Sequence, residues 1–289
     1  MLTSDLRDAL RGFARNPAFV AAAVLSLALG VGANTAIFSV ANALLLRPLP
    51  YADADRLVIL WNRSPGLGIA EDWFSTAQYF DVKNAGSGLE DVAIVYGANE
   101  NLTGDGGEPQ RIGSIRASSN VFTILGTQPV LGRLFTPEED TQTPANTAVL
   151  GYNTWVRRYG SDRNVIGRRI DLNGRPTTVV GVLPRDFEFT LRGRAELWLP
   201  VQPSPAQVER KFFHWLDAVG RLKPGVTREQ AEADLDRIAR GFASVDARFH
   251  ATSGAVAPRL RDRAVGDVKP LVLILTAAAA LVLLVACAN

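Results

Sequence analysis

The side chains best suited to acid–base, nucleophilic or metal chemistry are few in this sequence and lie far apart. The 289 residues include two histidines, His214 and His250, and one cysteine, Cys287. Neither histidine has a cysteine or carboxylate partner at the spacing of zinc ligands. The sequence has no G-x-x-x-x-G-K-[ST] phosphate loop and no G-x-S-x-G nucleophile motif. We therefore predict no catalytic, cofactor-binding or metal-binding residues and expect that the chain is not an enzyme.

Two acidic stretches could attract a cation, but each has a simpler structural role. Asp105 to Glu108 (DGGE) lies in the turn-rich segment 99–109 and is predicted to form a solvated hairpin tip. Glu138 to Asp140 (EED) follows a proline, where negative charge favours the first turn of a helix. His214 begins a predicted strand and is expected to pack against it.

The composition excludes some classes of partner and cross-link. The net charge is +2, and the charges between Pro48 and Lys269 balance. A nucleic-acid-binding domain would need a basic face, which a neutral region does not provide. A single cysteine cannot form an intrachain disulfide, so the sequence is compatible with either the cytoplasm or the periplasm.

The longest charge-free run covers the 31 residues 16–46 and is the element around which the rest of the chain is arranged. A bilayer-spanning helix needs roughly 20 apolar residues. Asn16 is a good N-cap, and Pro17 suits the first helical position. We predict a transmembrane helix over residues 17–46. Residues 1–16 are predicted to form a basic amphipathic helix on the cytoplasmic membrane surface.

Small residues on this helix predict a contact with another helix. Ala22, Ser26, Gly30 and Asn34 recur at four-residue spacing. Small side chains let helix backbones approach closely in lipid, where the hydrophobic effect does not drive association. We predict that these four residues form a helix-packing face. The alternative is that alanine and glycine are simply common in membrane helices.

A cleaved signal peptide is the main alternative for the N-terminal run. A cleavage-like triplet, Ala41-Asn42-Ala43, is present. However, the run is about twice as long as an ordinary signal-peptide core of roughly 7–15 residues. Three arginines precede the run, which favours a cytoplasmic N-terminus. Residues 47–269 are therefore expected outside the cytoplasm.

Residues 47–269 alternate between strand and helix patterns, which predicts an α+β domain. Asn173-Gly174 lies between two apolar runs and predicts a type I′ hairpin. The strands are expected at 56–61, 91–96, 110–116, 147–150, 169–172, 177–182, 196–201, 215–222 and 255–260. The helices are expected at 75–83, 120–125 and 153–159, and from Thr227 to Phe242.

The order of these elements predicts a division of the outer region. Two βαβ-like segments, 51–125 and 212–263, flank a strand-rich insert at 126–211. We expect the flanking segments to pair, because each alone would leave a sheet face uncovered. A second apolar run at 270–289 predicts a second transmembrane helix, and we interpret the chain as a fragment truncated within it.

At this level of detail the sequence resembles MacB/FtsX-type ABC transporter permeases, and most closely the large duplicated permeases of Acidobacteria. The N-terminal resemblance lies in Asp5 to Tyr51, DLRDALRGFARNPAFVAAAVLSLALGVGANTAIFSVANALLLRPLPY. In the insert it is carried by Gly132-Arg133-x-Phe135, Glu138-Glu139-Asp140, Trp155, Val165-Ile166-Gly167, Leu172-Asn173-Gly174, Val179-Val180-Gly181-Val182 and Leu197-Trp198-x-Pro200. Each piece is weak alone, but their shared order is specific.

The resemblance implies a fold, a topology and a set of partners. It implies an extracytoplasmic domain with a porter-like α+β part and a strand-rich insert, the MacB-like periplasmic core domain, in the cell inner membrane. It implies that a separate ABC ATPase hydrolyses ATP and that the permease couples this to motion of the outer domain. The further partners would be the remaining permease helices or second half, membrane lipid and a periplasmic adaptor protein, with no nucleic acid.

Two functions from other classes remain open at this point. An extracytoplasmic sensor module of a two-helix membrane receptor would have the same arrangement of helices and outer domain. A membrane-anchored adaptor is the other possibility. Two further apolar spans after Asn289 would favour the permease, whereas a helical linker with kinase motifs would favour the receptor.

Overall fold

A computed structural model describes residues 17–42, 49–64, 68–104, 107–140, 146–189, 191–209, 213–242, 254–266 and 268–288. The chain divides into two compact units. Unit 1 comprises Met1–Pro48 and Val265–Asn289, and unit 2 comprises Leu49–Ala264. The amphipathic helix predicted at 1–16 and the last turn of the helix predicted at 17–46 lie outside the described residues.

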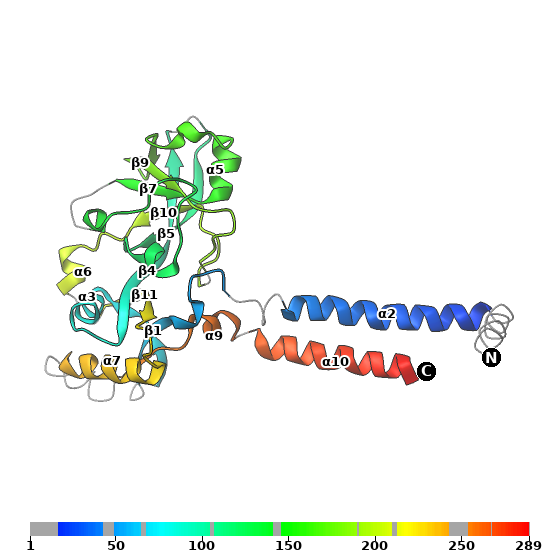
Figure 1. Cartoon of the computed structure of the whole chain (residues 1–289). Coiled ribbons are helices and arrows are strands. Elements are labelled where there is room, and N and C mark those ends of the chain that lie inside the picture. Colours follow the sequence, from blue (N-terminus) through cyan, green and yellow to red (C-terminus); the bar gives the residue numbers. More distant parts are fainter. Residues whose placement is uncertain are drawn as a thin grey trace. The chain divides into compact units, whose positions relative to one another are not determined.

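Unit 1 contains two apolar helices, α2 (Pro17–Ala41) and α10 (Lys269–Ala288) (Figure 1). α2 is the one described helix that is long and apolar enough to cross a membrane, and only 6% of its most apolar window is buried. Its 25 residues span about 38 Å, against a hydrocarbon core of about 30 Å. Leu29 is 72% exposed and Phe19 is 68% exposed. Side chains of this kind are stable at a helix surface when lipid surrounds them.

Unit 2 is built on one mixed sheet. The described strands follow the order β12-β1-β11-β4-β5-β10-β7-β9-β6. The pairs β10–β5 and β7–β9 are parallel, and the other pairs along this order are antiparallel. The strands in chain order are β1 (Leu57–Ser64), β2 (Ile69–Asp72), β3 (Phe74–Ser75), β4 (Leu89–Thr103), β5 (Gln110–Ala117), β6 (Leu131–Gly132), β7 (Thr147–Leu150), β8 (Arg169–Leu172), β9 (Arg175–Val182), β10 (Leu197–Pro200), β11 (His214–Leu222) and β12 (Gly254–Val256).

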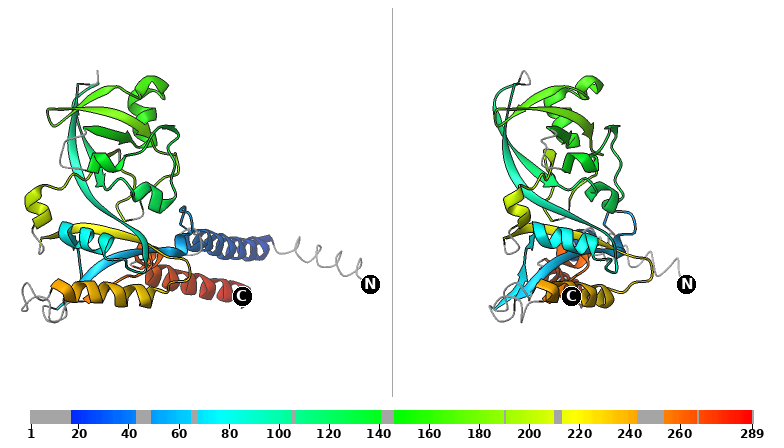
Figure 2. Two further views of the ribbon diagram at one scale, coloured as in Figure 1. Left: turned by 60° about the vertical axis from the view of Figure 1, so that its left-hand side comes forward. Right: turned by 90° about the vertical axis from the view of Figure 1, so that its left-hand side faces the viewer.

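The helices of unit 2 cover both faces of the sheet around β1, β11 and β4 (Figure 2). Val58 and Leu60 pack with side chains of α3 and α7, whereas Leu57 packs with α4 and α9 on the other face. This alternation is the period of two that a strand imposes. The α-helices are α3 (Thr76–Asn84), α4 (Val121–Leu125), α5 (Tyr152–Tyr159), α6 (Pro205–Glu209), α7 (Arg228–Phe242) and α9 (Leu260–Val265), and the 3-10 turns are η2 (Ala54–Arg56), η4 (Pro137–Asp140) and η5 (Arg163–Val165).

β11 lies between β1 and β4, so the two ends of unit 2 share one sheet. Ala218 pairs with Leu60 on one side and with Ile94 on the other. This arrangement confirms the predicted α+β class.

Several local predictions are confirmed by the structure. Ser75 caps α3 in a capping box, because its hydroxyl accepts from the Gln78 amide while the Gln78 side chain accepts from the Ser75 amide. Asn173 and Gly174 have φ values of 54° and 78°, as a type I′ turn requires. Ala231 and Leu235 of α7 are buried on the predicted face.

Two local predictions are wrong. The strand predicted at 255–260 ends at Val256, and Leu260 begins α9 instead. Pro258 has no amide hydrogen and cannot continue the ladder, although its carbonyl accepts from the Ile59 amide at 3.0 Å. The strand predicted at 91–96 extends to Thr103, because Leu102 is fully buried opposite Leu172 of β8.

Candidate functional site

In unit 1, Asn34 connects α2 to α10. Its side-chain amide donates to the Ala279 carbonyl at 2.8 Å and to the Gly30 carbonyl of its own helix at 3.0 Å. Gly30 is buried, and Ala279 is 5% exposed. A polar side chain that bonds across two apolar helices is a recognised way of holding membrane helices together.

The structure brings two of the four predicted packing residues to this contact. Gly30 and Asn34 lie against α10, whereas Ala22 and Ser26 are exposed. A residue advances about 100° around an α-helix, so each four-residue step drifts by about 40°. Residues at strict four-residue spacing therefore move off the face that contacts α10 within three steps. Ala41 of α2, which is 9% exposed, also lies on the buried side, and sequence reasoning missed it.

In unit 2, Arg221 of β11 holds the segment that follows the first helix. We call residues 49–56 the entry segment. Arg221 is 7% exposed and donates to the Ala52 carbonyl at 2.5 Å and to the Asp53 carbonyl at 3.3 Å. The same guanidinium donates to the Ile124 carbonyl of α4 at 2.5 and 3.1 Å. Burial lowers the pKa of Arg221, and the nearby charge of Arg56 lowers it further.

Further bonds fix both ends of the entry segment. Arg56 donates to the Leu222 carbonyl at 2.6 and 2.8 Å and forms an ion pair with Glu90. The Tyr51 hydroxyl donates to the Glu188 carbonyl at 2.5 Å. Ala52 also lies so close to Gly126 that a Cβ on that glycine would meet the Ala52 Cβ at 2.5 Å. Glycine is therefore required there for steric reasons and for its φ of 69°.

The other end of unit 2 is attached to the same core. The Arg259 backbone bridges to Val58, and Leu260 is fully buried in a cluster that also contains Tyr51 and Leu57. We call residues 258–264 the exit segment. The two segments that lead into and out of unit 2 are thus packed on one side of β1 and share one hydrophobic core.

The acidic stretch Glu138–Asp140 and His214 bind other groups of the protein. Glu139 binds Arg133 through both oxygens at 2.8 and 3.0 Å, and it accepts from the Thr136 amide. His214 Nδ1 lies 2.5 Å from the Asp72 carboxylate. Among the described residues no group of three or more metal-ligating side chains occurs. His250 and Asp105 lie outside the described residues.

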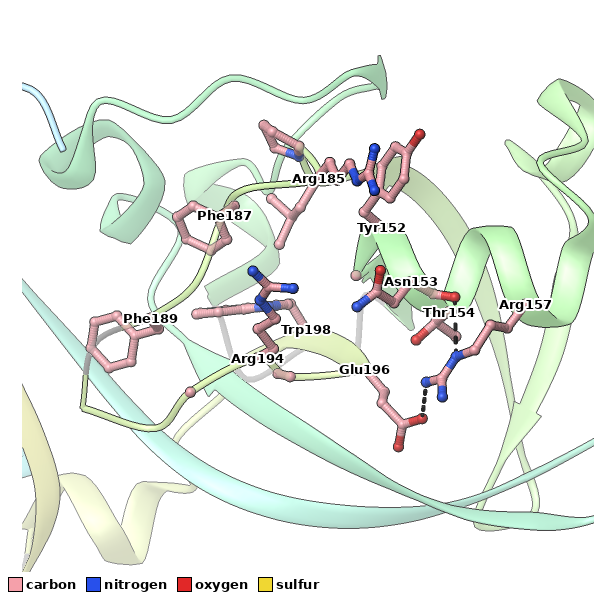
Figure 3. Close-up of a pocket in the computed structure, with 15 residues that line it drawn as sticks. Tyr152, Asn153, Thr154, Arg157, Arg185, Phe187, Phe189, Arg194, Glu196 and Trp198 are labelled. Carbon is pink, nitrogen blue, oxygen red and sulfur yellow. Dashed lines mark hydrogen bonds and ion pairs between the residues drawn. The ribbon is translucent and has the colours of Figure 1, made fainter. Parts of the chain in front are cut away.

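A cavity beside α5 is too small to be a ligand site. It has a volume of about 60 Å³ and lies between α5 and the loop that carries Phe187, Phe189 and Arg194 (Figure 3). Arg157 closes one side by binding Glu196 at 3.2 Å. A volume of this size holds a few water molecules.

Comparison with known proteins identifies the family. Residues 20–238 match the family described as MacB-like periplasmic core domain. A stretch of 120 residues is 28% identical to the syringafactin export ATP-binding/permease protein SyfD of Pseudomonas syringae pv. tomato. That match covers 41% of this chain but 18% of the relative, so the chain spans a small part of that protein's length.

Two solved structures have a similar fold. One is a domain of a permease protein from Porphyromonas gingivalis, with a TM-score of 0.56 and 16% identity over 73% of this chain and 93% of that one. The other is the periplasmic region of MacB from Actinobacillus actinomycetemcomitans, with a TM-score of 0.51 and 14% identity over 75% and 94%. With three-quarters of its residues matched by the family, this chain belongs to the MacB-like periplasmic core domain family, the extracytoplasmic domains of MacB/FtsX-type ABC transporter permeases.

Proposed function

We propose that the chain is a permease component that couples ATP hydrolysis by a partner ABC ATPase to motion of unit 2, for export or another transport step in the envelope. The family assignment supports the permease over the two-helix receptor considered above. The relative from Pseudomonas syringae carries ATP-binding and permease functions in its name, which supports the pairing with an ATPase.

The observation that carries this proposal is the rigid attachment of the entry segment. A flexible linker between a membrane helix and an outer domain would absorb a displacement of that helix. Here the entry segment is held by Arg221, Arg56 and the Tyr51 hydroxyl. The entry and exit segments also pack in the same hydrophobic core of unit 2. We infer that a displacement applied to the chain ahead of Tyr51 would be passed to the sheet of unit 2.

The proposal includes an orientation and further partners. Residues 1–16 are assigned to the cytoplasm and residues 47–269 to the periplasm, with the chain in the inner membrane. The exposed face of α2 that carries Ala22 and Ser26 is assigned to the remaining permease helices or to the second permease half. Membrane lipid surrounds the other apolar side chains, and a periplasmic adaptor protein is assigned to unit 2.

Labelling of single cysteines tests the orientation. Cys287 is the one native cysteine, so Cys287→Ser gives a clean background. Arg175 begins β9 and is exposed, and Arg175→Cys is expected to react with a membrane-impermeant maleimide in intact cells. Ser4→Cys is expected to react after lysis alone. The reverse pattern would contradict the assigned orientation.

An insertion tests the mechanical role. Two glycines placed after Pro50 lengthen the chain ahead of Tyr51, which is the first buried residue of the entry segment. The matched control carries two glycines after Gly160, at the exposed end of α5. Spin labels at Arg175 and Leu281 report the distance between the two units in the permease assembled with its ATPase.

We expect ATP to shift the measured distance distribution in the parent protein and in the Gly160 control. The Pro50 insertion is expected to retain ATP hydrolysis and to lose the shift. If the shift persists at full size after the Pro50 insertion, the entry segment does not transmit the motion.

A further inference from the structure

A second cavity in unit 2 is large enough for a small organic molecule. It has a volume of about 740 Å³ and lies between α3, α6 and the turn formed by Ser118–Asn120. We call it the α3–α6 cavity. Sites for small molecules usually measure about 300–1,000 Å³, so this cavity has the size of a ligand site, which the cavity beside α5 does not.

One wall of the α3–α6 cavity is apolar. It is formed by Phe80 of α3, Val208 of α6, and Val201 and Pro203 of the segment that joins β10 to α6. Phe80 is 37% exposed, and Val201 is buried at 4%. An apolar group that entered the cavity would be removed from water along this wall, which favours its binding.

The opposite side carries a fixed set of charges. Asp140 accepts from the Ser119 amide at 2.8 Å and from its hydroxyl at 2.7 Å. Asp91 accepts from the Asn120 side-chain amide at 2.7 Å. Lys83 donates to the Tyr79 hydroxyl at 3.0 Å. These contacts hold two carboxylates and one ammonium at the cavity, so its lining carries an excess of one negative charge.

The pKa shift of Lys83 preserves its positive charge, whereas the shift of Asp140 works against its negative charge. Burial raises the pKa of Asp140, and the hydrogen bonds from Ser119 oppose this effect in part. Burial alone would lower the pKa of Lys83, but the hydrogen bond to Tyr79 and the charges of Asp91 and Asp140 outweigh it and raise that pKa. The ammonium is thus retained, and a second cation would relieve the remaining negative charge.

We propose that the α3–α6 cavity binds a small amphipathic molecule with one basic amine. Its apolar part packs on Phe80, Val201, Pro203 and Val208, and its ammonium group lies beside Asp140 and Asp91. An anionic molecule would be repelled by the excess negative charge of the lining. A neutral molecule would bind through its contact with the apolar wall alone. This inference goes beyond the proposed function, because transmission through the entry segment does not depend on an occupant of this cavity.

Three fluorinated probes with the same apolar part test the proposal. They are 4-(4-fluorophenyl)butylamine, 4-(4-fluorophenyl)butanoate and 4-(4-fluorophenyl)butan-1-ol. Fluorine NMR line broadening measures their binding to the full chain in lipid nanodiscs, and empty nanodiscs of the same lipid correct for partition into the bilayer. The amine is expected to bind with a Kd about tenfold lower than that of the carboxylate, with the alcohol between them.

Variants test whether the probes bind in the α3–α6 cavity and whether its charged residues set the preference for the amine. Val208→Trp places a bulky ring at the apolar wall of the cavity and is expected to weaken binding of all three probes at least about tenfold. Asp140→Asn removes one negative charge and is expected to reduce the preference for the amine to about twofold. Asp186→Asn removes an exposed carboxylate elsewhere in unit 2 and is expected to change nothing. Circular dichroism verifies that each variant is folded.

Lys83→Met gives an independent test should Asp140→Asn fail to fold. It removes the ammonium from the lining, so the amine is expected to bind about threefold to tenfold more tightly and the carboxylate more weakly. Equal binding of the three probes, a preference for the carboxylate, or unchanged binding to Val208→Trp would each overturn the proposal.

Discussion

Arg221 shows how one side chain can join three backbone segments. Its guanidinium is charged and buried, and its hydrogen bonds go to carbonyl oxygens of the entry segment and of α4. A charged donor suits this position because it can donate to several carbonyl oxygens at once, whereas the Asp53 carbonyl also accepts from the Arg56 amide at 2.9 Å. Removal of the guanidinium therefore takes the charged donor away from the Ile124 and Ala52 carbonyls and leaves a gap in a buried position.

We expect Arg221→Met to lower the free energy of unfolding of unit 2 by about 2–4 kcal/mol. The chain has five tryptophans, at positions 61, 73, 155, 198 and 215, all within unit 2. Urea unfolding of the full chain in nanodiscs, followed by tryptophan fluorescence, therefore reports on this unit. Arg237→Met is the control, because Arg237 forms an exposed pair with Asp234 at 3.6 Å worth at most about 0.5 kcal/mol. A loss of equal size in both variants would contradict the role given to Arg221.

Glu139 makes a pH-dependent contribution whose sign can be worked out. Burial would raise its pKa, but the hydrogen bonds from Arg133 and the Thr136 amide outweigh burial, so the pKa is lowered. An unfolded glutamate titrates near about 4.3. Glu139 therefore stabilises the fold above that pH, and this stabilisation is lost as the pH falls through the lower folded pKa.

We expect Glu139→Gln to cost about 1–3 kcal/mol at pH 7 and progressively less below about pH 4. Urea unfolding at a series of pH values measures the difference between the two proteins. Glu209→Gln, at an exposed position on α6, serves as the control and is expected to give a difference near zero throughout. A Glu139→Gln difference that grows as the pH falls would show that the sign is wrong.

At the level of elements, α2 offers two faces that can be tested separately. Gly30 is buried against α10, whereas Ala22 is exposed in this structure. The pair Asn34→Cys and Ala279→Cys, in a Cys287→Ser background, is expected to form a disulfide under mild oxidation because the Asn34 amide reaches the Ala279 carbonyl.

We expect Gly30→Leu to slow that cross-link at least about fivefold, since a bulky side chain separates the two helices. Ala22→Leu is expected to leave the cross-linking rate unchanged and, if its face meets another permease helix, to weaken assembly with that helix. Equal effects of the two substitutions on the cross-link would contradict the packing described here.

The elements that sequence reasoning predicted well are those whose signals are local. Ser75 with Gln78, and Asn173 with Gly174, are adjacent or three residues apart, so their turn and cap geometry can be inferred from type and spacing alone. Arg221 could not be identified in this way. Its acceptors Ile124 and Ala52 lie 97 and 169 residues away, and no periodicity links them.

For the whole molecule, the separation into two units predicts that unit 2 folds without the helices. We expect residues 49–264 alone to unfold in one cooperative thermal transition, since a chain of this size buries roughly 70% of its extended surface. A shorter chain ending at Arg210 lacks β11, which pairs with both β1 and β4. The shorter chain is expected to unfold without a cooperative thermal transition for the part of the sheet that contains β1. If both chains melt with the same midpoint and cooperativity, the two ends do not form one sheet.

The 15-residue strand β4 has a consequence for exchanging parts between relatives. Its first half pairs with β11, while Leu102 near its end packs with Ile112 of β5 and with Leu172 and Val179 of the strand-rich insert. A chimera that exchanged residues 126–211 alone would divide this hydrophobic cluster between two parents. A chimera that folds would also have to exchange the hairpin residues from Asn99 to Ile112. The part that must be exchanged as a whole is therefore longer than the continuous insert 126–211.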